Sequence, residues 1–261
     1  MGVKERARKF MRDAGVPVLP GSKGVLSSAA QAMRTAAEIG YPVILKASAA
    51  GGRRGMRIVH EQREIAGQFA PAKQEVGAAF GCPDVYLDKY IGAPRHIEFQ
   101  VLADQYGNVE VLGERDCSIQ RRHQKLLEES PSPVLEDNLR NKVSDQLRSA
   151  LAAARYSNAG TVEFLMDEQG DLYFIEVNAR INVEHPVTEL VSGVDLVKSQ
   201  ILIAQGKRLT DLFDAPVQMR GHAIECRIPP FTPIGWFRLV TIPLSQNSSR
   251  LAATEQRRSA G

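Results

Sequence analysis

The sequence lacks the features that mark disulfide-rich and membrane-spanning proteins. Its three cysteines, Cys82, Cys117 and Cys226, are scattered and odd in number. This spacing argues against a disulfide framework or a zinc site and favours reduced thiols, so we expect a cytoplasmic protein. No apolar run approaches the about 18 residues that a membrane span requires, so we expect no membrane partner.

Charge of one sign is also scarce. The net charge is only +3 in a chain of 261 residues, of which 24% are charged and 43% hydrophobic. So small a basic excess gives no reason to expect a nucleic acid partner. The composition is that of a globular protein with one large domain or two smaller ones. The basic residues 1–15 include Glu5 and Asp13, so we interpret them as mature structure rather than a targeting helix.

The most informative stretch is TVEFLMDEQGDLYFIEVNARINVEH, residues 161–185. Two apolar runs flank a polar turn in which Gly170 can take a positive φ, a pattern that predicts an antiparallel hairpin. With the turn centred on residues 169 and 170, Glu163 lies directly opposite Glu176. Facing carboxylates repel each other, and a cation between them would relieve that repulsion.

The second strand of this hairpin adds further polar groups to the same face. Side chains two residues apart share a face, which groups Glu176 with Asn178 and Arg180, while Ile175 faces the core. Carboxylate and amide oxygens suit Mg²⁺ or Mn²⁺ that holds the phosphates of a nucleotide. A solvated hairpin face is the alternative, but it does not account for the amide and the arginine. We therefore predict a metal site formed by Glu163, Glu176 and Asn178.

A second polar stretch is GERDCSIQRRHQK, residues 113–125, with five basic groups: Arg115, Arg121, Arg122, His123 and Lys125. A solvated loop and a nucleic-acid patch are the alternatives. Acidic residues interleave with the basic ones, and no aromatic residues alternate with them to stack bases. The pattern therefore favours an active-site wall that binds a polyanion, and we interpret Cys117 as an unreactive thiol.

A third stretch, SAAGGRRGMRIV, follows a predicted strand that carries Lys46. Glycines let backbone amides approach a polyphosphate closely, and the lysine ammonium can reach the same phosphates. The remaining pattern predicts helices over 3–13, 27–39, 61–80, 136–157 and 191–206 and further strands over 85–91, 96–101, 109–112 and 220–228.

Together these motifs resemble the biotin carboxylases, the ATP-dependent subunits or domains of biotin-dependent acyl-CoA and pyruvate carboxylases. The similarity runs from residue 1 to about residue 228 and is close at YPVILKAS, PRHIEFQVLAD, ERDCSIQRRHQK, GVDLVKSQ and RGHAIECRI. It implies an α+β ATP-grasp fold, in which two α+β subdomains grip ATP beneath a mobile glycine-rich lid. The expected parts are residues 1–90, with the lid and the adenine-side strand, residues 91–228, with the metal and bicarbonate site, and a divergent, loose tail over 229–261.

The resemblance also implies a role for individual residues. The bicarbonate site would use the side chains of Arg180 and Lys125, the backbone of Val183, and Glu184 as the base. The expected nucleotide-binding residues are Lys4, Lys46, Gly51, Gly52, Gly55, Asp88, Lys89, Ile91, His96, Gln120, His123 and Leu165.

This sequence departs from the family pattern at several positions. The lid has Ala50 and Arg53 where glycine is usual, which restricts a segment that should move over ATP. Asp88 stands where glutamate is commoner, and Asn182 where glutamine is. The family's N-terminal α/β domain has no match in this sequence. The second arginine that the family has in its C-terminal subdomain has no match after residue 228.

The activity that the resemblance implies is ATP-dependent carboxylation of biotin on a carrier, with bicarbonate as the carbon source. Its expected cofactors are ATP, Mg²⁺ or Mn²⁺, and biotin as the carried substrate. The expected partners are a biotin carrier domain or protein and a carboxyltransferase subunit. The parent complex would be an acetyl-CoA or related acyl-CoA carboxylase of fatty acid biosynthesis. The full-length family member is expected to form a homodimer. Two alternatives stay open: another ATP-grasp ligase, such as a carbamoyl-phosphate synthase half, and an inactive Mg-ATP-binding fragment.

Overall fold

The computed structural model describes residues 4–47, 56–80, 84–121, 124–213, 217–228, 238–244 and 254–257. The chain forms two compact units, of which unit 1 comprises Met1–Val18 and Pro94–Gly261 and unit 2 comprises Leu19–Ala93. The expected boundary at residues 90 and 91 lies close to the observed one, but the first helix belongs to unit 1 rather than to the unit that follows it in sequence. Gly51, Gly52, Gly55 and His123 lie outside the described residues, as does the side chain of Lys4.

Unit 2 is a small antiparallel sheet with two helices. Its elements are α2 (Ala29–Ile39), β1 (Val43–Ala47), β2 (Arg57–Val59), α3 (Gln62–Phe80) and β3 (Val85–Lys89). The strand order is β2-β1-β3, and Leu45, Ile65 and Leu87 are fully buried between sheet and helices. Ser28 caps α2 by accepting a hydrogen bond from the Gln31 amide, as expected for a serine before an apolar periodic segment.

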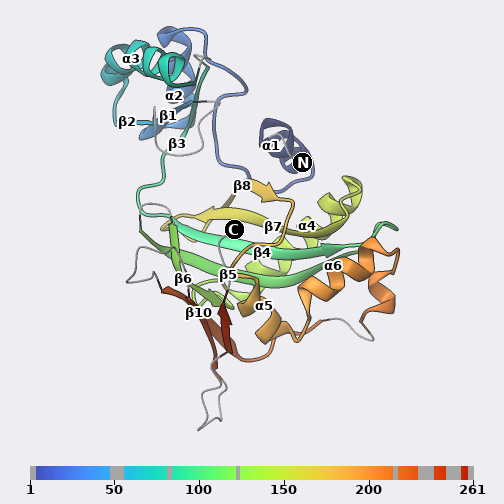
Figure 1. Cartoon of the computed structure of the whole chain (residues 1–261). Helices are drawn as coiled ribbons and strands as arrows, with labels where there is room; N and C mark the ends of the chain where they lie inside the picture. Colours follow the sequence, from blue (N-terminus) through green and yellow to red (C-terminus); the bar gives the residue numbers. More distant parts are fainter. Residues whose placement is uncertain are drawn as a thin grey trace. The chain divides into compact units, whose positions relative to one another are not determined.

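Over the described residues, unit 1 is built on an eight-stranded sheet with the order β11-β10-β9-β6-β5-β4-β7-β8. The long strands β4, β5 and β7 run side by side in Figure 1. The central strands are β4 (Arg95–Ala103), β5 (Val109–Arg121), β6 (Gln124–Ser130), β7 (Asn158–Met166), β8 (Leu172–Asn178) and β9 (His222–Ile228). The helices are α1 (Lys4–Asp13), α4 (Asp137–Ala153), α5 (His185–Ser192) and α6 (Leu196–Ala204), with a 3₁₀ turn at Leu209–Asp211. Each strand pairs antiparallel with its neighbours in this order.

The two faces of this sheet carry different helices. Side chains of α1 and α4, such as Met11 and Leu147, form one core with Phe99 and Phe164. On the other face, α6 packs against Leu102 and its neighbours, and α5 contacts β5, β6 and β9. Because side chains alternate along a strand, polar residues of β4 and β5 can face α5 while apolar ones face α4.

The predicted hairpin is confirmed at the residues that matter for the site. Glu163 on β7 pairs with Glu176 on β8, and Gly170 in the turn has φ +87°. Next to the turn, however, Phe164 pairs with Phe174, so that Ile175 is an extra residue in a β-bulge. The bulge places Phe174 in the core, where Ile175 was expected, because two consecutive residues there face a single partner position.

Two further expectations need correction. The helix expected over residues 191–206 is two helices, α5 and α6, because Gly193 takes a left-handed φ of +71° and ends the first. The expected loose tail contains two strands, β10 (Arg238–Leu244) and β11 (Thr254–Arg257). These strands extend the sheet because β9 would otherwise leave unpaired backbone groups at its edge.

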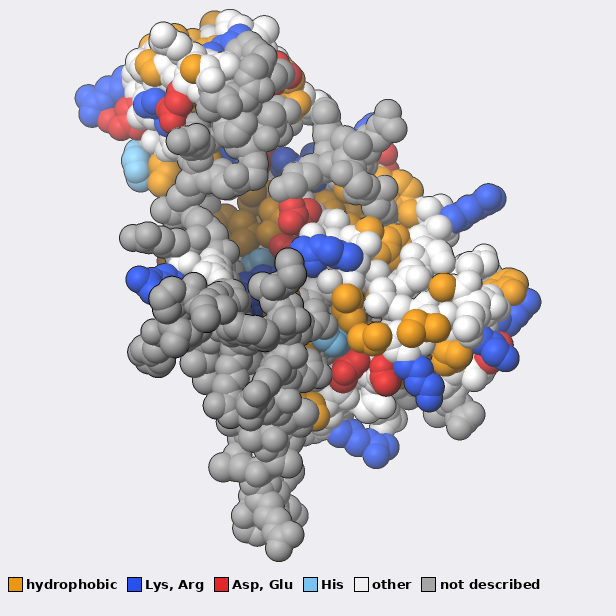
Figure 2. All heavy atoms as spheres, viewed as in Figure 1, with side chains coloured by type: hydrophobic (Ala, Val, Ile, Leu, Met, Phe, Trp, Pro, Cys, Tyr) orange, Lys and Arg blue, Asp and Glu red, His pale blue; other side chains and the backbone are white. Residues whose placement is uncertain are grey.

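Helix surfaces complete the description of unit 1. Among the described residues, no helix combines the length and the apolar character that crossing a bilayer would need. The α5–α6 segment does expose Leu190, Val197 and Ile201, and hydrophobic side chains are visible over these helices in Figure 2.

Candidate active site

The candidate site lies on the face of the unit 1 sheet that α5 covers, and a buried arginine is at its base. The guanidinium of Arg115 is fully buried and donates to Glu98 Oε1 at 2.6 Å. It also donates to the Gln100 side chain and Thr188 Oγ1, both at 2.8 Å, and to Thr161 Oγ1 at 3.2 Å. Burial opposes ionisation of Glu98, but the nearby charges of Arg115 and Lys125 outweigh it and lower the pKa of Glu98 to about 2.

Lys125 connects this base to the rest of the cluster. Its Nζ lies 2.5 Å from Glu98 Oε2, 2.5 Å from Glu184 Oε1 and 3.5 Å from Glu163 Oε1. Burial alone would lower the pKa of Lys125, yet the surrounding carboxylates, Glu98 first among them, raise it. The side chain is therefore a fixed positive charge that three carboxylates from β4, β7 and the start of α5 surround.

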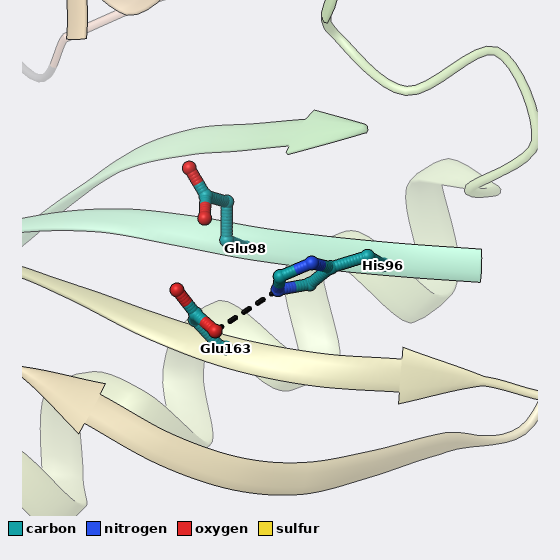
Figure 3. A group of neighbouring side chains, drawn as sticks. All are labelled: His96, Glu98 and Glu163. Atoms are coloured by element: carbon teal, nitrogen blue, oxygen red, sulfur yellow. Dashed lines mark hydrogen bonds and ion pairs between the residues drawn. The ribbon is translucent and has the colours of Figure 1, made fainter. Parts of the chain in front are cut away.

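His96 and Glu163 point toward each other from the neighbouring strands β4 and β7, with Glu98 beside them (Figure 3). His96 Nε2 lies 3.0 Å from Glu163 Oε2, and the Gln120 amide donates to Nδ1 at 2.9 Å. We therefore assign the ring proton to Nε2, where it faces the carboxylate. The predicted nucleotide residues His96 and Gln120 thus lie beside the predicted metal ligand Glu163, which His96 contacts directly.

The three predicted metal ligands come together from the two strands of the hairpin. Asn178 Nδ2 donates to Glu163 Oε1 at 2.7 Å, which leaves the amide oxygen of Asn178 as an acceptor. Burial opposes ionisation of Glu163, but the hydrogen bond from His96 and the charge of Lys125 lower its pKa. An ionised carboxylate, an amide oxygen and the half-buried Glu176 opposite fit a hard cation such as Mg²⁺ or Mn²⁺.

A second group of possible metal ligands, His96, Glu98 and Glu163, offers ligand atoms within 4.8 Å of one another. Lys125 already pairs with both of these carboxylates, and His96 with one of them. Glu98 is fully buried and already bonds both Arg115 and Lys125, so the hairpin set, which shares Glu163 but has the half-buried Glu176 in place of Glu98, remains the better candidate for a cation.

Glu184 is buried at the start of α5 and is held from three sides. Lys125 bonds its Oε1, Arg227 Nη2 lies 2.7 Å from its Oε2, and Asn182 Nδ2 donates to Oε1 at 3.2 Å. Arg180 Nη1 in turn donates to Asn182 Oδ1 at 2.5 Å. A carboxylate beside an ammonium and a guanidinium, with a second guanidinium linked to it through Asn182, is an arrangement that can bind a small anion and remove a proton from it.

The other predicted residues of unit 1 lie around this cluster. Val183, next to Glu184, is exposed. Leu165 is half-buried on β7, two residues beyond Glu163, and pairs with His96. Cys117 is buried, and burial raises the pKa of its thiol well above the usual range, which agrees with an unreactive cysteine.

The predicted residues of unit 2 form a separate group. Lys46 Nζ pairs with Asp88 Oδ2 at 3.1 Å. Lys89 Nζ donates to the carbonyls of Gly40 and Tyr41 at 3.0 and 2.9 Å, so the side chain covers the end of α2. The backbone N–H of Lys89 donates to the carbonyl of residue 20 at 2.8 Å. Ile91 is half-buried just beyond β3.

Sequence reasoning missed Glu98 and Arg227 as site residues and named Arg115 only as one basic group of the predicted active-site wall. Glu98 is a polar residue in the alternating strand PRHIEFQV, and Arg227 lies in the matched segment RGHAIECRI, so the sequence contained a signal for both. Arg227 places a guanidinium directly on Glu184. A cavity of about 640 Å³ elsewhere in unit 1, lined by Asn108, Arg148 and Phe213 among others, shares no residue with this cluster.

Known proteins share the sequence pattern and the fold of this chain. Residues 3–212 match the family described as carbamoyl-phosphate synthase L chain, ATP binding domain. The chain is 55% identical over 238 residues to a biotin carboxylase of Nostoc sp., covering 91% of this chain and 53% of that protein. It is 51% identical over 237 residues to a subunit of the pyruvate carboxylase of Methanothermobacter thermautotrophicus, covering 91% and 48%.

A solved structure with the same fold is the biotin carboxylase domain dimer of the 2-oxoglutarate carboxylase of Hydrogenobacter thermophilus, in complex with MgADP, ADP and bicarbonate. Its TM-score is 0.78 and its sequence identity 52%, over 87% of this chain and 50% of that one. The chain thus spans about half the length of the relatives that it matches.

Proposed function

The chain belongs to the ATP-grasp family of the carbamoyl-phosphate synthase L chain ATP-binding domain, among its biotin carboxylases, and we propose that it performs the bicarbonate-activating chemistry of a biotin carboxylase. The observation that supports this best is the environment of Glu184. The buried carboxylate of Glu184 contacts Lys125 and Arg227. Arg180 donates a hydrogen bond to Asn182, which donates one to Glu184. These are the groups that bicarbonate binding and deprotonation require.

In this proposal, Arg180 and Lys125 bind the bicarbonate oxygens together with the backbone amide of Val183. The guanidinium can offer two parallel hydrogen bonds, whereas the ammonium supplies a point charge. Glu184 Oε accepts the bicarbonate proton, so that the resulting oxyanion can attack the γ-phosphorus of ATP, whose bond to the β,γ-bridging oxygen breaks as ADP leaves. Glu98 and Arg115 hold Lys125 in place, because the fully buried carboxylate of Glu98 bonds both cations.

Glu163, Glu176 and Asn178 would hold Mg²⁺ or Mn²⁺, which when bound neutralises charge on the nucleotide phosphates. His96 and Gln120 orient Glu163 from one side, and Lys46 carries a positive charge on unit 2. The expected nucleotide-binding set remains Lys4, Lys46, Gly51, Gly52, Gly55, Asp88, Lys89, Ile91, His96, Gln120, His123 and Leu165. The MgADP and bicarbonate in the Hydrogenobacter relative support both sites.

The acceptor is biotin on a carrier domain or protein, and the partner is a carboxyltransferase. The relatives include a biotin carboxylase, a subunit of a pyruvate carboxylase, and a 2-oxoglutarate carboxylase. The proposed parent complex is therefore a biotin-dependent carboxylase in general and is not restricted to acetyl-CoA or other acyl-CoA carboxylases. The dimer of the Hydrogenobacter relative supports a homodimer as the assembly. A cytoplasmic location remains part of the proposal, supported by the free thiols of Cys117 and Cys226.

The proposal predicts ATP hydrolysis that depends on bicarbonate and is stimulated by free biotin. Replacing the base by Glu184→Gln should lower this rate by about 10²–10⁴-fold, because the general base is lost while the shape is kept. Phosphate release with and without bicarbonate, biotin and ammonia measures it. The control Glu110→Gln changes a carboxylate that pairs with Arg148 outside the cluster and should leave the rate unchanged.

Other outcomes would identify an alternative. Stimulation by ammonia instead of biotin would indicate a carbamoyl-phosphate synthase type of ligase. Tight Mg-ATP binding with a background rate of hydrolysis would indicate a nucleotide-binding polypeptide that lacks turnover.

A further inference from the structure

Two glutamates face each other in the sheet beside the proposed base. Glu128 on β6 and Glu225 on β9 are directly opposite in the antiparallel register, and both side chains have no exposed surface. Opposite residues of an antiparallel pair project from the same face of the sheet, and like charges in this arrangement destabilise it. Neither residue belongs to the metal, nucleotide or bicarbonate sites described above.

The hydrogen-bonding state of this pair is unusual. Among the described residues, no group hydrogen-bonds to either carboxylate oxygen of Glu225. Glu128 Oε1 lies 2.6 Å from Arg227 Nη2, an ion pair whose angles fall short of a hydrogen bond. A buried ionised carboxylate without a hydrogen-bond donor is costly enough that it takes up a proton instead.

The charge of the whole cluster favours the same outcome. Among the described residues, its buried carboxylates are Glu98, Glu128, Glu163, Glu184 and Glu225. The permanent cations in contact with them are Arg115, Lys125 and Arg227. With every carboxylate ionised the cluster would have two negative charges in excess, and one proton on the pair halves that excess.

We propose that Glu128 and Glu225 share one proton at neutral pH and act as a positioning pair, which through Arg227 holds Glu184 in place. This inference rests on the proposed function, in which Glu184 is the base. One of the two carboxyl groups keeps a proton, so the pair has a single negative charge. Burial raises the pKa of Glu225 to about 8 and that of Glu128 to about 7, in agreement with a retained proton.

Arg227 transmits the charge of the pair to the base. Its Nη2 lies 2.6 Å from Glu128 Oε1 and 2.7 Å from Glu184 Oε2, so one nitrogen serves both carboxylates. When the pair loses its proton, the added charge draws the guanidinium toward Glu128 and weakens its hold on Glu184. The other charged groups that face the pair are Arg115 of β5 and Lys125 of β6, and the register position opposite Glu225 on β10 is Thr241.

Infrared spectroscopy of the full chain tests the shared proton directly. At pH 7 surface carboxylates are ionised, so a carbonyl stretch of a protonated acid, shifted in D₂O, reports a buried one. We expect this band in the parent, its loss in the double variant Glu128→Gln/Glu225→Gln, and its retention in Glu129→Gln. Glu129 is the matched control because it neighbours Glu128 on β6 but contacts His222 instead. Absence of the band in the parent, or its persistence in the double variant, would overturn the retained proton.

The coupling to Glu184 is tested by the pH at which the band disappears. Glu184→Gln removes a negative charge that competes for Arg227, so the band should disappear at lower pH than in the parent. An unchanged midpoint would overturn the positioning role. Because these spectra need no turnover, they decide the matter even if the chain has no bicarbonate-dependent activity.

Where activity is present, its pH profile gives a further readout. The bicarbonate-dependent rate of the parent should fall as the pH rises through about 8, whereas Glu225→Gln, which cannot gain that charge, should not show this fall. Identical profiles of the two proteins would also contradict the positioning role.

Discussion

At the scale of single residues, the two facing glutamates of the hairpin are chemically alike in the sequence but differ in the structure. Glu163 is bonded by His96 and Asn178 and lies near Lys125, so its charge is compensated without a metal. Glu176 is half-buried and lies opposite it. Neutralising Glu163 therefore disturbs these side-chain bonds, whereas neutralising Glu176 leaves them in place and removes the repulsion between the pair.

We predict that Glu176→Gln reduces the thermal stabilisation that Mg-ATP confers, because one metal ligand becomes a weaker, neutral one. The metal-free protein should keep its stability or gain about 0.2–1 kcal/mol, the usual size of a cross-strand pair. Thermal melts of parent and variant, each with and without Mg-ATP, measure both effects. An unchanged shift with Mg-ATP would exclude Glu176 from the metal site.

At the scale of elements, the β7–β8 hairpin depends on its turn and on its bulge. Gly170 has φ +87°, and Asp167 accepts hydrogen bonds from the amides of Gln169 and Asp171 within the turn. The bulge at Ile175 then restores the register that places Glu163 opposite Glu176. The hairpin therefore delivers its metal ligands only if both irregularities form.

We predict that Gly170→Ala destabilises the protein by about 1–2 kcal/mol, because a residue with a Cβ is disfavoured at positive φ. The added Cβ would meet Met166 Cε at 3.5 Å, an ordinary contact, so the cost comes from the backbone. Urea denaturation measures it. Gly170→Asn is the matched control and should cost less, since asparagine tolerates this conformation; equal losses in both would point to crowding instead.

At the scale of the whole molecule, buried carboxylates make stability depend on pH in two opposite ways. The pKa of Glu98 is lowered from 4.5 to about 2, so its contribution is present above pH 4.5 and is lost as the pH falls through 2. The pKa of Glu225 is raised from 4.5 to about 8, so its contribution is present below pH 4.5 and is lost as the pH rises through 8.

We therefore predict that the free energy of unfolding is greatest near pH 4.5, falls below it as Glu98 takes up a proton, and falls progressively above it up to about pH 8. Between about pH 6 and pH 9 the loss should be at least about 1 kcal/mol, and Glu225→Gln should remove much of it. Urea denaturation across this range tests the prediction. A parent whose stability is constant up to pH 9 would contradict it.

The sequence by itself determined the family and the α+β class through its resemblance to the biotin carboxylases, and it determined the hairpin through local pattern. Alternating residues and a glycine at the turn were enough to place Glu163 opposite Glu176. The motifs INVEHPVTE and ERDCSIQRRHQK marked Glu184 and Lys125 before any contact between them was known.

Only the tertiary structure decided which of these residues touch, since they come from strands that are distant in sequence. Arg115, Glu98 and Arg227 joined the site because β5, β4 and β9 bring them to the face that α5 covers. The bulge at Ile175 and the strands within residues 229–261 could not be read from a periodic pattern, since a bulge interrupts the alternation and edge strands form by pairing with a neighbour. The protonation of Glu128 and Glu225 likewise depends on burial and on neighbouring charge, which no local pattern at either position reveals.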